Sequence, residues 1–210
     1  MADYTFLYDD VCPLCQAYTA GFARLQWSDR KPFSQVDHRS CDNLDLDRGR
    51  HEIPLLDAET GEVHYGLDAM TTVLGQGLPF LRPLFRHPYF LAALKPLYWL
   101  ITYNRRVIAG TKPPATGFDC APDFHRAWRL AYVGIMVLVI SLLGWPPVLL
   151  TAGMVVLLVV GGVLHGNYLV FAGHWVTLVF VAALISALIP GILGLGLAYA
   201  WLAWELWRRF

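Results

Sequence analysis

A long uncharged stretch constrains this chain more than any other feature. Between Arg129 and Glu205 there is no Asp, Glu, Lys or Arg. A membrane-spanning helix needs about 20 apolar residues, so the stretch has room for three or four such helices. The whole chain is 56% hydrophobic and only 15% charged, which is too apolar for an ordinary soluble protein. We therefore predict that the C-terminal half is a membrane domain.

Turn residues divide this half into four predicted spans. Gly and Pro cluster at 144–147 and 190–191, and His165-Gly166-Asn167 makes a third break. Four spans return the chain to its starting side, and basic residues flank both ends of the domain there, so we predict that both termini are cytoplasmic. Three spans would leave the basic flanks on opposite sides. The predicted spans are Arg129–Leu143, Val148–Leu164, Tyr168–Ile189 and Ile192–Trp207.

The N-terminal half carries two cysteines, Cys12 and Cys15, at the junction of a strand and a helix. An apolar run, Tyr4–Tyr8, predicts a buried strand before them, and a helical pattern follows and ends near Trp27. Pro13 suits the first helical position, which makes Cys12 the N-cap. The unpaired N–H groups and the helix dipole favour a thiolate there. We expect Cys12 to be the nucleophile and Cys15, one turn later, the resolving thiol.

The elements that follow predict a small α/β domain of thioredoxin-like type. Their order is strand, cysteine helix, strand, connection, hairpin and helix. The turn at 58–61 lies between two short apolar runs, which is typical of a β-hairpin. The predicted elements are a strand at Lys31–His38, a loop or short helix at Asn43–Arg50, hairpin strands at Ile53–Asp57 and Glu62–Gly66, and a helix at Ala69–Leu74 capped by Asp68.

Pro54 begins the hairpin. In a thioredoxin-like domain the strand that faces the dithiol starts with a cis X-Pro bond, and we predict this form for Ile53-Pro54. A proline there leaves no N–H beside the sulfur atoms, and it turns the backbone of Ile53 toward a bound substrate. The alternative is that Pro54 opens an edge strand in the trans form.

Two short motifs resemble the DCC family of thiol-disulfide oxidoreductases, which is named for an Asp followed by two Cys. They are Asp9 with Cys12-Pro13-Leu14-Cys15, and Tyr65-Gly66-Leu67-Asp68-Ala69 downstream. The similarity covers roughly residues 4–110. It implies a thioredoxin-like fold and a redox dithiol, with Asp9, Cys12 and Cys15 as the signature residues. The family usually has Gly where this chain has Asp10, which would add negative charge near Cys12 and oppose thiolate formation.

A metal site is the main alternative for the two cysteines. A closed zinc site needs four ligands, so two more would have to come from Cys41, Cys120, His38 or His51. The spacing of these residues is irregular, and Pro directly after Cys12 favours redox chemistry, so we predict no metal. Cys41 and Cys120 belong to no second CxxC and are expected to be free thiols.

Two roles are possible for each of three other ionisable residues. Asp9 could be a proton acceptor for Cys15 if it is buried, or a residue that ends the strand. In the membrane half, His165 and His174 could bind haem or contact a quinone. Each lies near a predicted loop or span end, so we expect both at the membrane interface instead.

Basic and aromatic residues alternate between 69 and 118, where no acidic residue occurs. Such a segment could bind nucleic acid, but next to a membrane domain it is expected to lie in the lipid headgroup region. Pro83, Pro88 and Pro96 are predicted to break it into short pieces, and Lys112–Pro122 is predicted to be a linker. The basic residues are Arg82, Arg86, Lys95, Arg105, Arg106 and Lys112.

The sequence therefore predicts three regions: a thioredoxin-like domain at 1–78, an interfacial segment and linker at 79–126, and a four-helix transmembrane domain at 127–210. We expect a membrane-anchored thiol-disulfide oxidoreductase with Cys12 and Cys15 as catalytic residues, supported by Asp9, Pro13, Ile53 and Pro54. No cofactor is expected beyond the dithiol. Expected partners are a protein or small-molecule thiol or disulfide and the lipid bilayer, without nucleic acid.

The N-terminus has neither a basic n-region nor a long apolar core, so we expect no cleavable signal peptide and a cytoplasmic redox domain. Two other functions stay open at this stage. One is a membrane assembly or transport protein whose N-terminal domain docks partners. The other is a membrane electron-transfer protein.

Overall fold

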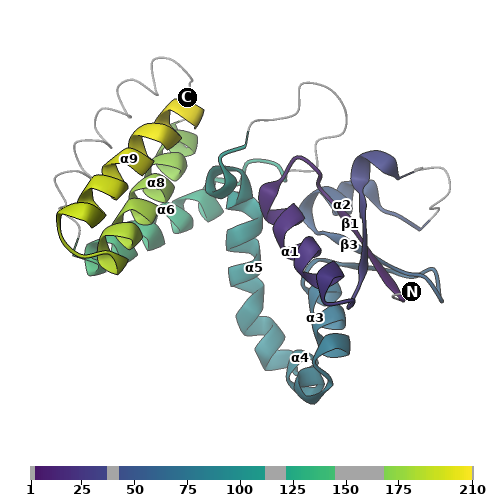
Figure 1. The fold of residues 1–210 in the computed structure, drawn as a ribbon. Coiled ribbons are helices and arrows are strands. Elements are labelled where there is room, and N and C mark those ends of the chain that lie inside the picture. Colours follow the sequence, from purple (N-terminus) through teal and green to yellow (C-terminus); the bar gives the residue numbers. More distant parts are fainter. Residues whose placement is uncertain (1–2, 37–42, 112–121, 145–167, 210) are drawn as a thin grey trace. The chain divides into compact units, whose positions relative to one another are not determined.

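The computed structural model describes residues 3–36, 43–111, 122–144 and 168–209 (Figure 1). The chain divides into two compact units, Met1–Phe124 and His125–Phe210.

A four-stranded mixed sheet forms the centre of the N-terminal unit. Its strands are β1 (Tyr4–Tyr8), β2 (Asp29–Pro32), β3 (Pro54–Asp57) and β4 (Val63–Tyr65), in the spatial order β2-β1-β3-β4. β1 and β2 are parallel and are joined through helix α1 (Pro13–Arg24), while β3 is antiparallel to both β1 and β4. The predicted first strand and hairpin are confirmed. The second strand is shorter and earlier than predicted, because the chain enters a 3-10 helix, η1 (Phe33–Gln35), directly after Pro32.

Side chains alternate along β1 and place a core on each face of the sheet. Phe6 points to one face, where it packs with Leu55 of β3 and with Val73 of α3 (Gly66–Gly77). Leu7 points to the other face and packs with Phe33 and Val36, next to Leu46 of α2 (Leu46–His51). The sheet is thus covered on both sides (Figure 1).

Helix α3 begins earlier than the sequence predicts. Tyr65 is its N-cap and Asp68 lies in its first turn, so the prediction that Asp68 is the cap is wrong. Gly66 has φ +60°, a backbone conformation that other residues rarely adopt. A Cβ at this position would lie 2.9 Å from the hydroxyl oxygen of Tyr98. The glycine therefore permits both the turn into α3 and the close approach of Tyr98.

The basic and aromatic segment folds as part of the N-terminal unit. It contains η2 (Pro79–Leu81), α4 (Arg82–Phe85) and the long helix α5 (Pro88–Ala109), which packs against α1 and α3. The prediction that Pro96 breaks the segment is wrong, because α5 runs through it. Pro96 lies on the exposed face of the helix, where water can satisfy the carbonyl that a proline leaves without a donor.

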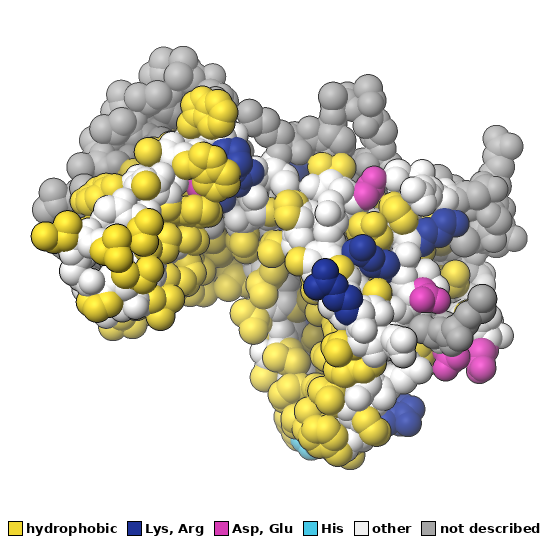
Figure 2. Space-filling view, viewed as in Figure 1, with side chains coloured by type: hydrophobic (Ala, Val, Ile, Leu, Met, Phe, Trp, Pro, Cys, Tyr) yellow, Lys and Arg dark blue, Asp and Glu magenta, His cyan; other side chains and the backbone are white. Residues whose placement is uncertain are grey.

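Three helices are described in the C-terminal unit: α6 (Arg126–Leu142), α8 (Tyr168–Leu188) and α9 (Ile192–Arg209). They occur where three of the four spans are predicted, and the fourth, Val148–Leu164, lies outside the described residues. α8 packs against both other helices. Among the described helices only α8 is long and apolar enough to cross a membrane, with mean hydropathy 2.1, a property that a buried core helix can share. Four spans are therefore not established. Hydrophobic side chains cover much of the visible surface of this unit (Figure 2).

Buried polar groups connect the three helices near the start of α6 and α8 and the end of α9. The hydroxyl groups of Tyr132 and Thr177 are 2.8 Å apart. Arg209 donates to Glu205 at 2.7 Å and to Nδ1 of His174 at 3.0 Å. Glu205 is only 1% exposed. His174 is thus part of a helix-packing cluster.

Candidate active site

Cys12 and Cys15 lie where β1 passes into α1. Asp9 shapes the turn: its carboxylate accepts the N–H of Val11 at 3.0 Å, and its carbonyl accepts the N–H of Cys12 at 3.2 Å. Cys12 is the N-cap, as predicted, and its carbonyl accepts the N–H of Gln16 at 3.0 Å. Both cysteines are free thiols, and they are only 4% and 3% exposed. The local sequence therefore presents two adjacent, shielded sulfur atoms at the start of a helix.

Arg105 of α5 reaches this turn. Its Nη1 lies 3.8 Å from the sulfur of Cys15, and its Nη2 lies 3.6 Å from the carboxylate of Asp9. The side chains of Arg105 and Asp9 are each 12% exposed. Burial alone would lower the pKa of Arg105, but the negative charges of Cys15, Asp9 and Cys12 raise it. A fixed positive charge thus lies beside the dithiol.

The two thiols differ strongly in acidity. Hydrogen bonds from the side chain of Cys15, then from its backbone, together with the charge of Arg105, lower the pKa of Cys12 to about 6, although burial opposes this shift. The same side-chain hydrogen bond and burial raise the pKa of Cys15 well above its usual range. At neutral pH Cys12 is therefore the thiolate and Cys15 the thiol that donates to it.

An apolar cavity of about 230 Å³ opens beside Cys15. Tyr18 hydrogen-bonds the sulfur of Cys15, and the hydroxyl of Tyr98 is bonded to Thr102 and to the backbone of Ile53. Burial raises the pKa of Tyr98 to about 12, so it stays neutral. The cavity is lined by Leu14, Cys15, Tyr18, Ile53, Met70, Tyr98, Ile101, Thr102 and Arg105.

Pro54 lies at the head of β3, but its peptide bond is trans, so the predicted cis form is wrong. β3 is also a central strand, between β1 and β4, and not an edge strand. The carbonyl of Ile53 accepts the N–H of Gly66 at 2.9 Å, and Pro54 pairs with Tyr65 across the hairpin. The backbone of Ile53 is thus occupied by the hairpin and by Tyr98, while its side chain lines the cavity.

Asp10 does not disturb the turn. It has no positive φ, so the backbone here does not need the glycine that the family usually has. Its carboxylate is exposed and accepts a hydrogen bond from Ser34 at 2.9 Å. The carboxylate whose negative charge raises the pKa of Cys12 is that of Asp9.

Within the described ranges, no three His, Cys, Asp or Glu side chains lie close enough to hold a metal ion. Four residues weighed as ligands or as additional redox groups, Cys41, Cys120, His38 and His165, fall outside those ranges. His51 is described, and its Nδ1 lies 3.1 Å from the carbonyl of Asp47.

The sheet and the paired cysteines define a small α/β domain that carries a dithiol. In a comparison with known families, the model of the DCC1-like thiol-disulfide oxidoreductase family matches residues 6–111, just over half of the chain. The chain belongs to this family, whose name describes thiol-disulfide oxidoreductase activity. Searches among curated proteins and among solved structures found no match. The family match extends through α5, the helix that supplies Arg105.

Sequence reasoning missed Arg105, Tyr18 and Tyr98 as parts of the site. It treated Arg105 as one of several basic residues at a membrane surface. The available signal was weak: Tyr98, Thr102 and Arg105 are spaced four and three residues apart, which places the three side chains on one face of a helix. Only the packing of α5 shows that this face meets the dithiol.

Proposed function

We propose that this protein is a membrane-anchored thiol-disulfide oxidoreductase in which Cys12 is the nucleophile and Cys15 the resolving thiol. The opposite pKa shifts of the two thiols carry this proposal. The sheet order β2-β1-β3-β4, with α1 between the parallel strands, supports a thioredoxin-like fold for the domain. The dithiol itself is the redox group, and no further cofactor is needed.

The exchange has two steps. The thiolate of Cys12 attacks one sulfur of a partner disulfide, whose S–S bond breaks as a mixed disulfide forms and the first partner thiolate leaves. Cys15 then attacks the sulfur of Cys12, the mixed disulfide breaks, and the second partner thiolate leaves and takes up the proton that Cys15 has lost. The dithiol has given up two electrons and the partner disulfide has gained them. In the reverse direction the Cys12–Cys15 disulfide oxidises a partner dithiol.

Arg105 and Asp9 act as positioning residues in this scheme. The guanidinium near Cys15 stabilises the thiolate that must form in the second step, and Asp9 holds the guanidinium and shapes the turn. This use of Asp9 differs from the predicted proton acceptor, and its bonds to the turn and to Arg105 favour it. Pro13 starts the helix, the side chain of Ile53 lines the cavity beside Cys15, and Pro54 begins β3 directly after it.

The buried state of both cysteines restricts the partner. Cys12 is only 4% exposed, so a slender group reaches its sulfur more easily than a bulky one. The cavity beside Cys15 has apolar walls, which include Leu14, Ile53 and the exposed side chain of Ile101. We infer that the partner presents its sulfur on an apolar segment or small molecule.

Membrane anchoring is supported by α8 and by the uncharged stretch that contains it. Four spans, with both termini and the dithiol on the cytoplasmic side, are the arrangement that the basic flanks favour. Residues 127–210 are then the anchor, and the segment through α5 completes the redox domain, because α5 packs against α1 and α3 and supplies Arg105 to the site.

Two measurements test the proposal. The Cys12→Ser variant should lose exchange with a small disulfide such as hydroxyethyl disulfide, since it lacks the attacking sulfur. If it exchanges as fast as the parent chain, the redox function is wrong. An impermeant alkylating reagent should label Cys12 only after cells are permeabilised, and labelling in intact cells would contradict the cytoplasmic orientation.

A further inference from the structure

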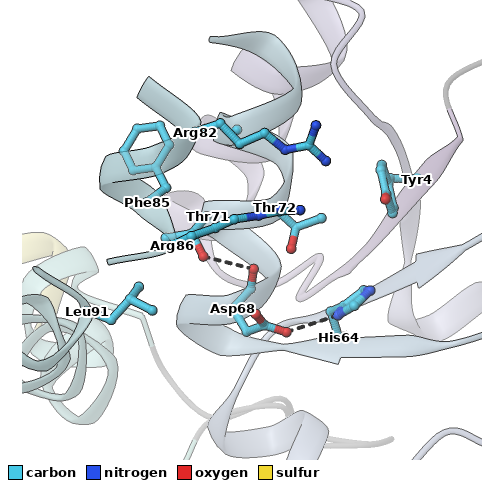
Figure 3. Close-up of a pocket in the computed structure, with 10 residues that line it drawn as sticks. Tyr4, His64, Asp68, Thr71, Thr72, Arg82, Phe85, Arg86 and Leu91 are labelled. Atoms are coloured by element: carbon cyan, nitrogen blue, oxygen red, sulfur yellow. Dashed lines mark hydrogen bonds and ion pairs between the residues drawn. The ribbon is translucent and has the colours of Figure 1, made fainter. Parts of the chain in front are cut away.

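A second cavity, of about 450 Å³, lies away from the dithiol and between α3, α4 and the sheet (Figure 3). Its walls come from β1, β4, α3, α4 and the start of α5. None of its lining residues is shared with the cavity beside Cys15. The redox proposal leaves this space without a role.

Hydrogen-bond donors converge on this cavity. Arg82 and Arg86 both line it, and within the described part of the chain neither guanidinium has a hydrogen bond or an ion pair. Figure 3 shows the side chain of Arg82 extending toward Tyr4 on the far wall. The hydroxyl groups of Tyr4 and Thr72 also face the space, and neither takes part in a hydrogen bond among the described residues.

The acidic residue of the cavity is already paired. Asp68 lies 2.9 Å from Nδ1 of His64, an interaction drawn in Figure 3. Thr71 is occupied as well, since its hydroxyl donates to the carbonyls of Leu67 and Asp68. The cavity therefore offers a surplus of positive charge and free donors on the side formed by α4.

Three other arginines of this unit are paired with carboxylates. Arg48 pairs with Glu52, Arg50 with Asp123 and Arg105 with Asp9. Arg82 and Arg86 instead lie four residues apart at one cavity, with the apolar side chains of Phe85 and Leu91 beside them. Two guanidinium groups that can each donate two parallel hydrogen bonds match the oxygen atoms of a phosphate.

We propose that this cavity binds a small organic phosphate. Arg82 and Arg86 donate hydrogen bonds to its phosphate oxygen atoms, and Phe85 and Leu91 pack against the apolar part of the molecule. The phosphate can come from a lipid headgroup or from a soluble metabolite. Phe80 and Tyr89, next to the arginines in sequence, are 75% and 81% exposed, which is compatible with a nearby lipid surface.

Equilibrium dialysis of the full chain, in a detergent without phosphate, tests the site with inorganic phosphate as the probe. We expect saturable binding that the double variant Arg82→Gln, Arg86→Gln weakens at least ten-fold. Arg24→Gln is the matched control, because Arg24 is also exposed and lines neither cavity. Absence of saturable binding, or equal loss in the control, would overturn the proposal.

Competition identifies the source of the phosphate. Glycerol 3-phosphate and monomeric dihexanoyl phosphatidylglycerol are each added against bound inorganic phosphate. Displacement by the lipid alone assigns a headgroup, displacement by both assigns a soluble phosphate, and displacement by neither contradicts the proposal. The Cys12→Ser variant should bind phosphate as the parent does, so this test is independent of the redox function.

Discussion

Both units of the molecule bury an arginine beside a carboxylate, but the two pairs have different surroundings. In the N-terminal unit Arg105 lies 3.6 Å from Asp9 and also contacts the sulfur of Cys15, on the wall of a cavity. In the C-terminal unit Arg209 lies 2.7 Å from Glu205 and also contacts His174 of another helix. The first pair is placed to act on a reactive group, and the second to hold helices together. A buried ion pair is therefore not by itself a sign of a functional site.

The largest effect is expected at the dithiol. The Cys15→Ser variant should accumulate a stable mixed disulfide between Cys12 and its partner, because the thiol that would release the partner is gone. Mass spectrometry of the intact chain after incubation with a small disulfide measures the adduct. Cys41→Ser, which leaves the CxxC intact, should form no lasting adduct at Cys12. Equal turnover in the Cys15→Ser variant and the parent would rule out the resolving role.

The Glu205→Gln variant tests whether the ion pair between Arg209 and Glu205 holds the helices of the C-terminal unit together. It leaves Arg209 buried without its carboxylate, and removal of one partner of a buried pair typically costs about 3–5 kcal/mol. We expect faster hydrogen exchange in α8 and α9, with exchange in β1 and β3 unchanged. Arg208→Gln is the control. Arg208 also binds Glu205, but its side chain is 36% exposed, so the loss in the free energy of unfolding should stay within about 1 kcal/mol.

Two glycines with similar backbone angles test how closely α5 must approach α3. Gly61→Ala, at φ +70° with no atom near the new Cβ, should cost only the left-handed backbone penalty of about 1–2 kcal/mol. Gly66→Ala, at φ +60°, also places the Cβ against Tyr98 and against the side chain of Glu52, and it should cost more. Chemical unfolding of both variants measures the difference. Equal losses would show that the contact with Tyr98 is not required.

The smallest effect is expected for Arg105→Gln. The charge of Arg105 helps to lower the pKa of Cys12, so its loss should raise that pKa above about 6. The rate of alkylation of Cys12 should then fall several-fold near pH 6 and change little above pH 9, where the thiolate is formed in either protein. Arg106→Gln, the neighbouring arginine, should leave the pH profile in place. An unchanged profile for Arg105→Gln would place Arg105 in a purely structural role.

Local patterns accounted for much of the N-terminal unit. The apolar run before Asp9 predicted β1, Pro13 predicted the start of α1 with Cys12 at its N-cap, and the turn at 58–61 predicted the hairpin of β3 and β4. Each of these depends on residues close together in the sequence, so short-range stereochemistry is sufficient. The prediction of a cis Ile53-Pro54 bond was wrong, because it depended on where the strand lies relative to the cysteine helix, which is far away in the sequence. In the structure Pro54 pairs with Tyr65 in the β3–β4 hairpin.

The sequence by itself determined a dithiol at the start of a helix and an uncharged C-terminal half. Only the tertiary structure decided that Arg105, ninety residues after Cys15, lies beside it, because that contact depends on how α5 packs against α1 and α3. The different acidities of Cys12 and Cys15 follow partly from this packing, since burial and a distant charge are properties of the folded chain. Residue spacing can place two sulfur atoms near each other, but their surroundings depend on the whole domain.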